Sequence, residues 1–104
     1  VGFPSVEREL DIVRLKAPGA SERLYRQVVE FVQRMRTLDL FKSPGVAETI
    51  DWTNALVALN SLQLDPASVQ DTLGVLLKHQ DDIVKMQSGD TVKLLDELRA
   101  KALL

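Results

Sequence analysis

Few side chains in this sequence are of the types that catalyse reactions or bind metals. His79 is the only histidine and cysteine is absent, whereas a metal site needs several ligands at fixed spacing. Asp81 and Asp82 are adjacent, and adjacent residues on a helix do not face one another, so we expect a solvated helix start rather than an acid/base pair. His79 is expected near the end of a helix, where partial positive charge suits the dipole.

The basic residues and the single tryptophan each allow two interpretations. Arg23, Arg26, Arg34 and Arg36 could contact an acidic surface or a phosphate, but their spacing among acidic residues favours the solvent face of an amphipathic helix. Trp52 could be a stacking platform, but its position in an apolar segment favours a core anchor. No phosphate loop is present and no nucleophile with its base is apparent, so we expect no catalysis by this chain alone.

The stretch KSPGVAETIDW, residues 42–52, has the pattern of a helix start. Either Ser43 is the N-cap with Pro44 in the first turn, or Gly45 is the N-cap and the Glu48 carboxylate reaches back to it. In both cases free backbone N–H groups and the positive end of the dipole point out of the segment, which suits an anion. Glu48 opposes direct phosphate contact, because its own charge would repel the anion.

Helical periodicity accounts for the elements that position these residues. Val6, Leu10 and Val13 form an apolar stripe over residues 5–16, and Leu24 to Met35 repeats the pattern opposite a polar stripe that includes Gln27. Residues 46–62 are apolar on most sides, which predicts a central helix. Asp65 and Pro66 begin a fourth helix over 64–78, whose internal Gly74 we attribute to close approach of a neighbouring helix, and a last helix is expected at 90–103 with Leu95, Leu98 and Ala102 on one face.

The sum is an all-α fold, a small four- to five-helix bundle. We expect one helical domain over residues 1–104, in which residues 86–104 show only a generic amphipathic pattern. The formal net charge of −2 is far from the basic footprint of nucleic-acid binding, and no apolar run approaches the ~20 residues that span a membrane. We therefore expect no nucleic-acid or membrane partner and a cytoplasmic location. The start at Val1 suggests a piece of a longer protein.

Four segments together resemble a known family. FPSVERELDIVRLKAPGAS, LYRQVVEFVQRMR, LFKSPGVAETIDWTNALVAL and LDPASVQDTLGVLLK look like the C-terminal lid of MoxR-like AAA+ ATPases, in the branch with CoxD-type proteins. The resemblance covers residues 3–85, and SPGVAETIDW is its most specific part. Such a lid is a helical bundle that follows an α/β nucleotide-binding core. The resemblance thus implies an ATPase with ATP and Mg²⁺ in the full-length protein, although this chain lacks the phosphate loop.

The resemblance also implies how the helix start is used. Related lids carry a sensor-2 arginine there that reaches the nucleotide phosphates, and alignment on Glu48 and Trp52 puts Ala47 in its place. An alanine cannot make the bidentate bonds of an arginine, so that role does not carry over. The nucleotide-adjacent candidates are Pro44, Gly45, Val46 and Ala47, acting through backbone and apolar contacts, unless SPGVAE merely starts a helix.

The implied partners are the protein's own AAA+ core domain, neighbouring subunits of a hexameric ring, and clients linked to von Willebrand factor A domain proteins or metalloenzyme assembly. The alternative is a freestanding helical interaction module that never meets nucleotide and presents an apolar groove. A lid instead implies apolar or mixed surface near both Phe3 and residues 43–48. A helix-turn-helix DNA binder is disfavoured by the net charge and by Asp51.

Overall fold

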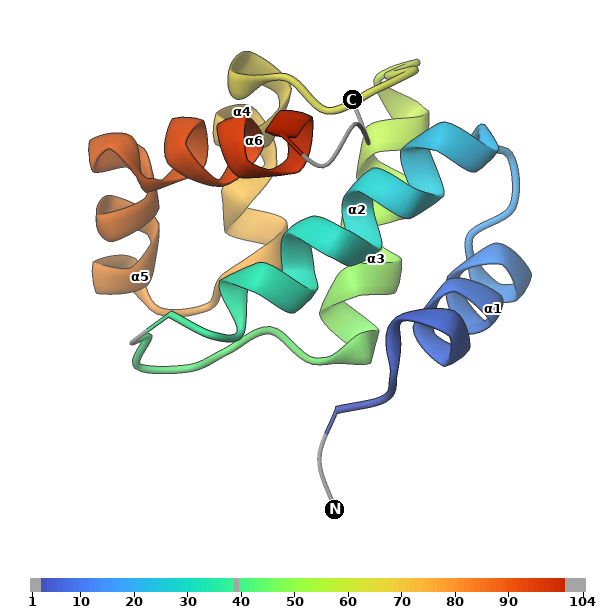
Figure 1. Ribbon diagram of the computed structural model, residues 1–104, viewed down its shortest axis with the longest axis horizontal. Helices are drawn as coiled ribbons and strands as arrows, with labels where there is room; N and C mark the ends of the chain where they lie inside the picture. Colours follow the sequence, from blue (N-terminus) through green and yellow to red (C-terminus); the bar gives the residue numbers. More distant parts are fainter. Residues whose placement is uncertain (1–2, 39, 101–104) are drawn as a thin grey trace.

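Serine or aspartate side chains cap the starts of three helices in the computed structural model, which describes residues 3–38 and 40–100 (Figure 1). Ser5 accepts a hydrogen bond from the Arg8 amide at the start of α1 (Val6–Lys16), and Ser21 does the same for α2 (Glu22–Met35). Asp65 caps α4 (Pro66–Leu76), with Pro66 in its first turn. These three caps confirm the sequence-based helix starts, because each short polar side chain satisfies an otherwise unpaired backbone N–H.

Helix α3 (Val46–Ala58) packs against α1, α2 and α4. Trp52 lies fully buried on it, 5.5 Å from the Phe31 ring between centroids, and its indole N–H donates to the Thr72 hydroxyl at 2.6 Å. The core-anchor interpretation of Trp52 is thus confirmed. The predicted apolar stripe of α2 is also confirmed, and all its members are buried: Leu24, Val28, Phe31 and Met35. Helix α3 ends four residues earlier than predicted, at a turn in which Asn60 has φ of 58°.

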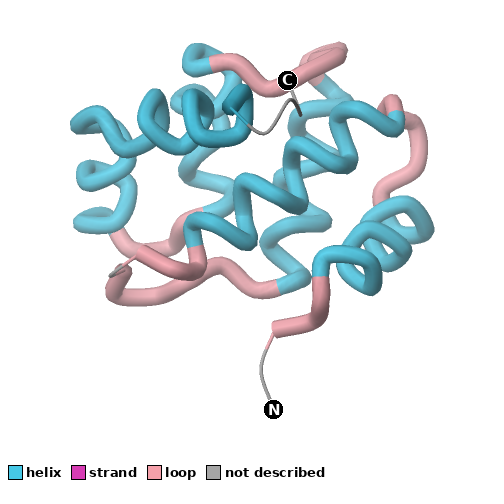
Figure 2. The backbone as a smooth tube through the Cα atoms, in the orientation of Figure 1, coloured by secondary structure: helices cyan, strands magenta, loops and turns pink. Residues whose placement is uncertain are grey.

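The C-terminal third of the described chain is bent. Helix α5 (Gln80–Lys85) continues through a π-helical segment, Met86–Asp90, into α6 (Thr91–Ala100), and the two α-helices point in clearly different directions (Figures 1 and 2). Gly89 has φ of +122° in the bend, and the Thr91 hydroxyl donates to the Met86 carbonyl at 3.0 Å. This bend lets α6 lie against α2 and α4, with Leu95 and Leu98 buried as predicted. Ala102 lies outside the described residues.

Among residues 3–38 and 40–100 every regular element is helical, so the all-α expectation is confirmed, but six α-helices replace the expected four or five. The additional helix is α5, whose six residues are too few to show a periodic pattern. Gln27 was also misassigned to the polar face. It is buried, and its side-chain oxygen accepts from the Leu64 amide at 2.6 Å, which ties α2 to the loop before α4.

An exposed ion pair joins α1 to α2. The Arg14 guanidinium donates to the Glu22 carboxylate, and these hydrogen bonds hold the pKa of Glu22 below its usual range. A lowered carboxyl pKa contributes stability above the unfolded-state pKa, and that contribution is lost as pH falls through the folded-state pKa. Because both side chains are solvated, the contribution is small.

Gly74 does not mark a close helix approach, contrary to the sequence-based expectation. It is exposed on α4, and an added Cβ would meet nothing within 4 Å. Gly74→Ala is therefore expected to raise the free energy of unfolding by about 0.5–1 kcal/mol, since alanine has the better helix propensity and restricts the unfolded chain. Urea denaturation followed by circular dichroism measures this change.

Gly89 provides the matched control, because an added Cβ there also meets open space. Its φ of +122° is one that L-residues rarely adopt, so Gly89→Ala is expected to lower the free energy of unfolding by about 1–3 kcal/mol. Effects of the same sign for the two substitutions would contradict the assigned backbone conformations.

Candidate functional site

The start of α3 is capped by its own backbone and one carboxylate. Gly45 is the N-cap, and its amide donates to Glu48 Oε1 at 2.8 Å, while the Thr49 amide donates to the Gly45 carbonyl at 3.1 Å. Of the two alternatives left by the sequence, the structure therefore has Gly45 with Glu48 as half a capping box. The Glu48 carboxylate occupies the positive end of the helix, where an external anion would otherwise be favoured.

The four nucleotide-adjacent candidates run from the residue before the N-cap into the first turn of α3, and they differ in exposure. Pro44 is buried, Gly45 and Val46 are half-buried, and Ala47 is exposed. The turn can thus present a small apolar face and the unpaired amides of a helix start, together with the negative charge of Glu48. Such a surface can contact a planar or apolar ligand group more readily than a phosphate.

A buried ion pair lies directly behind this turn. Arg36 follows α2, and its guanidinium binds the Glu9 carboxylate of α1 through two hydrogen bonds of 2.8 Å each. The two side chains are 5% and 0% exposed respectively. Arg36 Nε also donates to the Pro44 carbonyl at 2.8 Å, one residue before the N-cap of α3. The expectation that Arg36 belongs to a solvent face is wrong.

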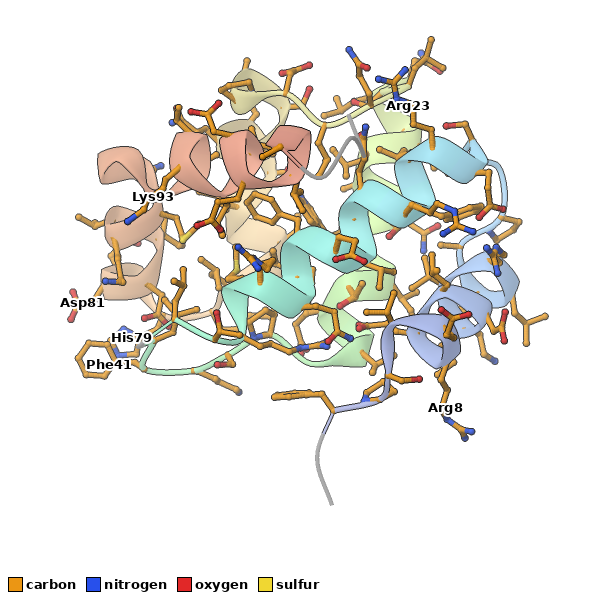
Figure 3. The ribbon with its side chains drawn as sticks, in the orientation of Figure 1. Arg8, Arg23, Phe41, His79, Asp81 and Lys93 are labelled. Carbon is orange, nitrogen blue, oxygen red and sulfur yellow. The ribbon has the colours of Figure 1, made fainter. Side chains whose placement is uncertain are left out.

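The other three arginines of that group lie nearer to solvent. Arg23 and Arg26 are exposed, and Arg23 points away from the bundle in Figure 3. Arg34 is about one-third exposed and pairs with Glu97 of α6. Solvent-face placement is thus confirmed for Arg23 and Arg26, whereas Arg34 contributes to packing of α2 against α6.

The N-terminal segment, Phe3–Pro4, closes over the same ion pair. The Phe3 ring covers the Arg36 guanidinium at 4.2 Å from its centroid, and Phe3 remains 51% exposed. The Gln33 amide group donates to the Pro4 carbonyl at 3.1 Å and to Glu9 Oε1 at 2.8 Å. We call Phe3, Pro4, Glu9, Gln33, Arg36 and Pro44 the Arg36 network. It joins the segment before α1 to the start of α3, at a surface of mixed polarity.

The sequence contains a signal for this network that the sequence-based expectations overlooked. Glu9 falls on the apolar stripe of α1, three residues after Val6 and four before Val13. Arg36 extends the buried face of α2 four residues beyond Val32. A carboxylate and a guanidinium on two facing apolar stripes indicate a buried pair, because a charge is rarely buried without its partner.

A second carboxylate fixes the tip of the loop between α2 and α3. Asp82 lies in the first turn of α5, as expected of a helix start, but it is 1% exposed and accepts from the amides of Phe41 and Lys42 at 2.8 and 3.0 Å. Only its assignment to solvent is therefore wrong, and Asp81 beside it is exposed as expected. Phe41 remains 74% exposed and stacks on His79, with centroids 4.5 Å apart (Figure 3). His79 is the N-cap of α5, where Nδ1 accepts from the Asp81 amide at 3.3 Å. It therefore begins a helix rather than ending one.

A recess of about 300 Å³ lies between α2 and α6. It is lined by Arg34, Lys93 and Glu97 together with Thr37 and two leucines.

The described residues contain no group of three or more His, Asp or Glu placed to hold a metal ion. In the same part of the chain, no helix is both long and apolar enough to cross a bilayer. No protein-family model, curated protein or solved structure matches this chain.

Proposed function

We propose that this chain is the C-terminal lid of a MoxR-like AAA+ ATPase, in which the start of α3 faces bound nucleotide. The observation that supports the proposal is the Arg36 network. Through Arg36, it connects Phe3–Pro4, through which a lid would join its core domain, to the helix start that would meet nucleotide. The exposed Phe3 ring and the exposed Ala47 support the mixed surface expected near Phe3 and residues 43–48.

In this proposal Gly45, Val46 and Ala47 contact the nucleotide through backbone and apolar groups. The Glu48 carboxylate already neutralises the positive end of α3, so the backbone amides of this turn are not expected to bind the phosphates. The cations that bind phosphate would then come from the core domain or a neighbouring subunit. Pro44 is buried and would act by fixing the turn rather than by touching ligand.

The full-length protein would be a cytoplasmic ATPase that uses ATP and Mg²⁺ and assembles as a hexameric ring. Closure of the lid over nucleotide would rotate it relative to the core and the adjacent subunit, as hinge-coupled domains do. Its work would be the remodelling or maturation of a client, linked to von Willebrand factor A domain proteins or to metalloenzyme assembly. These properties rest on the family resemblance.

One observation favours a second candidate, a helical interaction module without nucleotide binding. Phe41 is largely exposed yet held in one position by the buried Asp82, which is the arrangement of a preorganised contact residue. Such a module was expected to have an apolar groove. The recess between α2 and α6 is instead lined by charged side chains as well as leucines, so we place this candidate second.

Ala47→Arg tests the lid proposal by adding the missing cation at an exposed position. A guanidinium that reaches a nucleotide phosphate is expected to tighten Mg-ADP binding by about tenfold or more, the value of one charge-assisted hydrogen bond in a site. Isothermal titration of the 104-residue chain measures the affinity.

Ala58→Arg is the matched control, because Ala58 is also exposed on α3 but lies at its opposite end. The lid proposal requires that arginine at residue 47 raises the affinity for Mg-ADP and that arginine at residue 58 does not. Equal effects of the two substitutions would indicate nonspecific attraction of the anion, and would contradict a nucleotide-facing helix start.

A further inference from the structure

We propose that Arg36 is a positioning residue that couples the direction of Phe3–Pro4 to the conformation of the first turn of α3. The meaning of this coupling for ATPase control rests on the proposed lid function. The coupling itself is a property of this chain and can be measured without nucleotide.

Arg36 makes contacts in three different directions. Two of its nitrogens bind Glu9 of α1, Nε binds the Pro44 carbonyl before α3, and the guanidinium carbon lies 4.2 Å from the centroid of the Phe3 ring. Its Nη2 also lies 3.4 Å from the Thr49 hydroxyl, which belongs to α3. A planar fork with five donors can hold all these partners at once, whereas the point charge of a lysine cannot.

The bond between Arg36 and the Pro44 carbonyl also closes the loop that connects α2 to α3. The amides of Phe41 and Lys42 in this loop donate to the buried Asp82, and the Pro44 carbonyl at its end accepts from Arg36. A displacement of Arg36 therefore acts directly on Pro44, which precedes the N-cap Gly45.

The N-terminal segment reaches Arg36 by two routes. Phe3 rests on the guanidinium, and Gln33 binds both the Pro4 carbonyl and the Glu9 carboxylate. A change in the direction of the chain before α1 thus acts on the guanidinium and on its counterion together. These polar contacts connect the segment to α3 in addition to the apolar cluster on which Val6 of α1 and Ile50 of α3 both pack.

A double-mutant cycle tests this coupling directly, since such cycles separate interaction from independent effects. Amide hydrogen exchange at Gly45 and Thr49 is followed by NMR in the unsubstituted chain, in Phe3→Ala, in Arg36→Lys, and in the double variant. We expect Phe3→Ala to change these exchange rates by about twofold or more when Arg36 is present. This factor corresponds to the lower end of the interaction energies between residues of one hydrogen-bond network. In the Arg36→Lys background the same substitution is expected to have no effect on them.

Two controls make the result specific. Leu15→Ala removes an exposed side chain of α1 outside the network, and the amides of Ser68 and Val69 report on the distant start of α4. The effect of Leu15→Ala on the exchange rates at Gly45 and Thr49 is expected to be the same with Arg36 as with Lys at position 36. The exchange rates of the Ser68 and Val69 amides are likewise expected not to depend on the residue at position 36. Equal responses to Phe3→Ala in both backgrounds would overturn the proposal, as would no response at Gly45 and Thr49.

The design keeps two possible failures apart. If Arg36→Lys does not fold, Phe3→Ala alone decides, because a response no larger than that of Leu15→Ala refutes the coupling. Loss of the coupling leaves the nucleotide measurements on Ala47→Arg untouched. Conversely, a chain that does not bind nucleotide can still show the coupling. The coupling would then transmit binding of another partner at the N-terminal segment to α3.

Discussion

Arg36→Met is expected to lower the free energy of unfolding by about 3–5 kcal/mol, because it leaves the Glu9 carboxylate buried without its counterion. The variant also removes the donor to the Pro44 carbonyl. Among the described residues, Gln33 is the side-chain donor that remains to the fully buried Glu9, and one hydrogen bond cannot compensate a full charge. Denaturant unfolding followed by the fluorescence of the single tryptophan, Trp52, measures the change.

The combined variant Glu9→Leu, Arg36→Met distinguishes charge burial from lost packing. Replacing a buried ion pair by apolar residues of similar volume is often neutral, so the double variant should recover most of the lost stability. Arg23→Met removes an exposed arginine of α2 and is expected to change little. A double variant as unstable as Arg36→Met alone would contradict the assignment of a buried, uncompensated charge as the cause.

Trp52→Ala carries the second large expected effect, a loss of about 3–5 kcal/mol in the free energy of unfolding. The substitution empties a fully buried position between α3 and its neighbours, where the ring packs on Phe31. It also removes the hydrogen bond to the Thr72 hydroxyl of α4. Far-ultraviolet circular dichroism during urea unfolding measures the change, since the fluorophore is absent from this variant.

Leu59 supplies the control at the end of the same helix, because its side chain is 57% exposed. Leu59→Ala is expected to change the free energy of unfolding by no more than about 0.5 kcal/mol. Similar losses for the two substitutions would mean that α3 is not the central helix of the bundle.

Local signals in the sequence were sufficient for most helix starts and for the main core. Ser5, Ser21 and Asp65 each accept a hydrogen bond from the amide three residues later. Caps of this kind can be predicted from the sequence, because both partners lie within one short stretch of it. Helical spacing placed Leu24, Val28, Phe31 and Met35 on the buried face of α2, where one apolar stripe meets the core. The Gly45 cap with Glu48 was also one of the two arrangements that the sequence allowed.

Interactions between distant residues were the ones that sequence reasoning missed. Glu9 and Arg36 are 27 positions apart, and Asp82 binds the amides of Phe41 and Lys42, which lie 41 and 40 positions before it. Arg36 and Asp82 were assigned to solvent, and Glu9 was overlooked, because the buried partner of each comes from another element. The prediction that Gly74 marks a close helix approach was wrong for a related reason. The low helix propensity of glycine can be read from the sequence, but the open space around Gly74 depends on where the other helices pack.

The proposed contact between the start of α3 and a nucleotide can be tested by an NMR titration of the 104-residue chain with Mg-ADP. Backbone amides from Gly45 to Trp52 are followed, with Ser68 and Val69 at the start of α4 as the reference. The lid account predicts concentration-dependent shifts that begin in the first turn of α3 and are absent from α4. No shift of the α3 amides at millimolar nucleotide, or equal shifts at both helix starts, would contradict it.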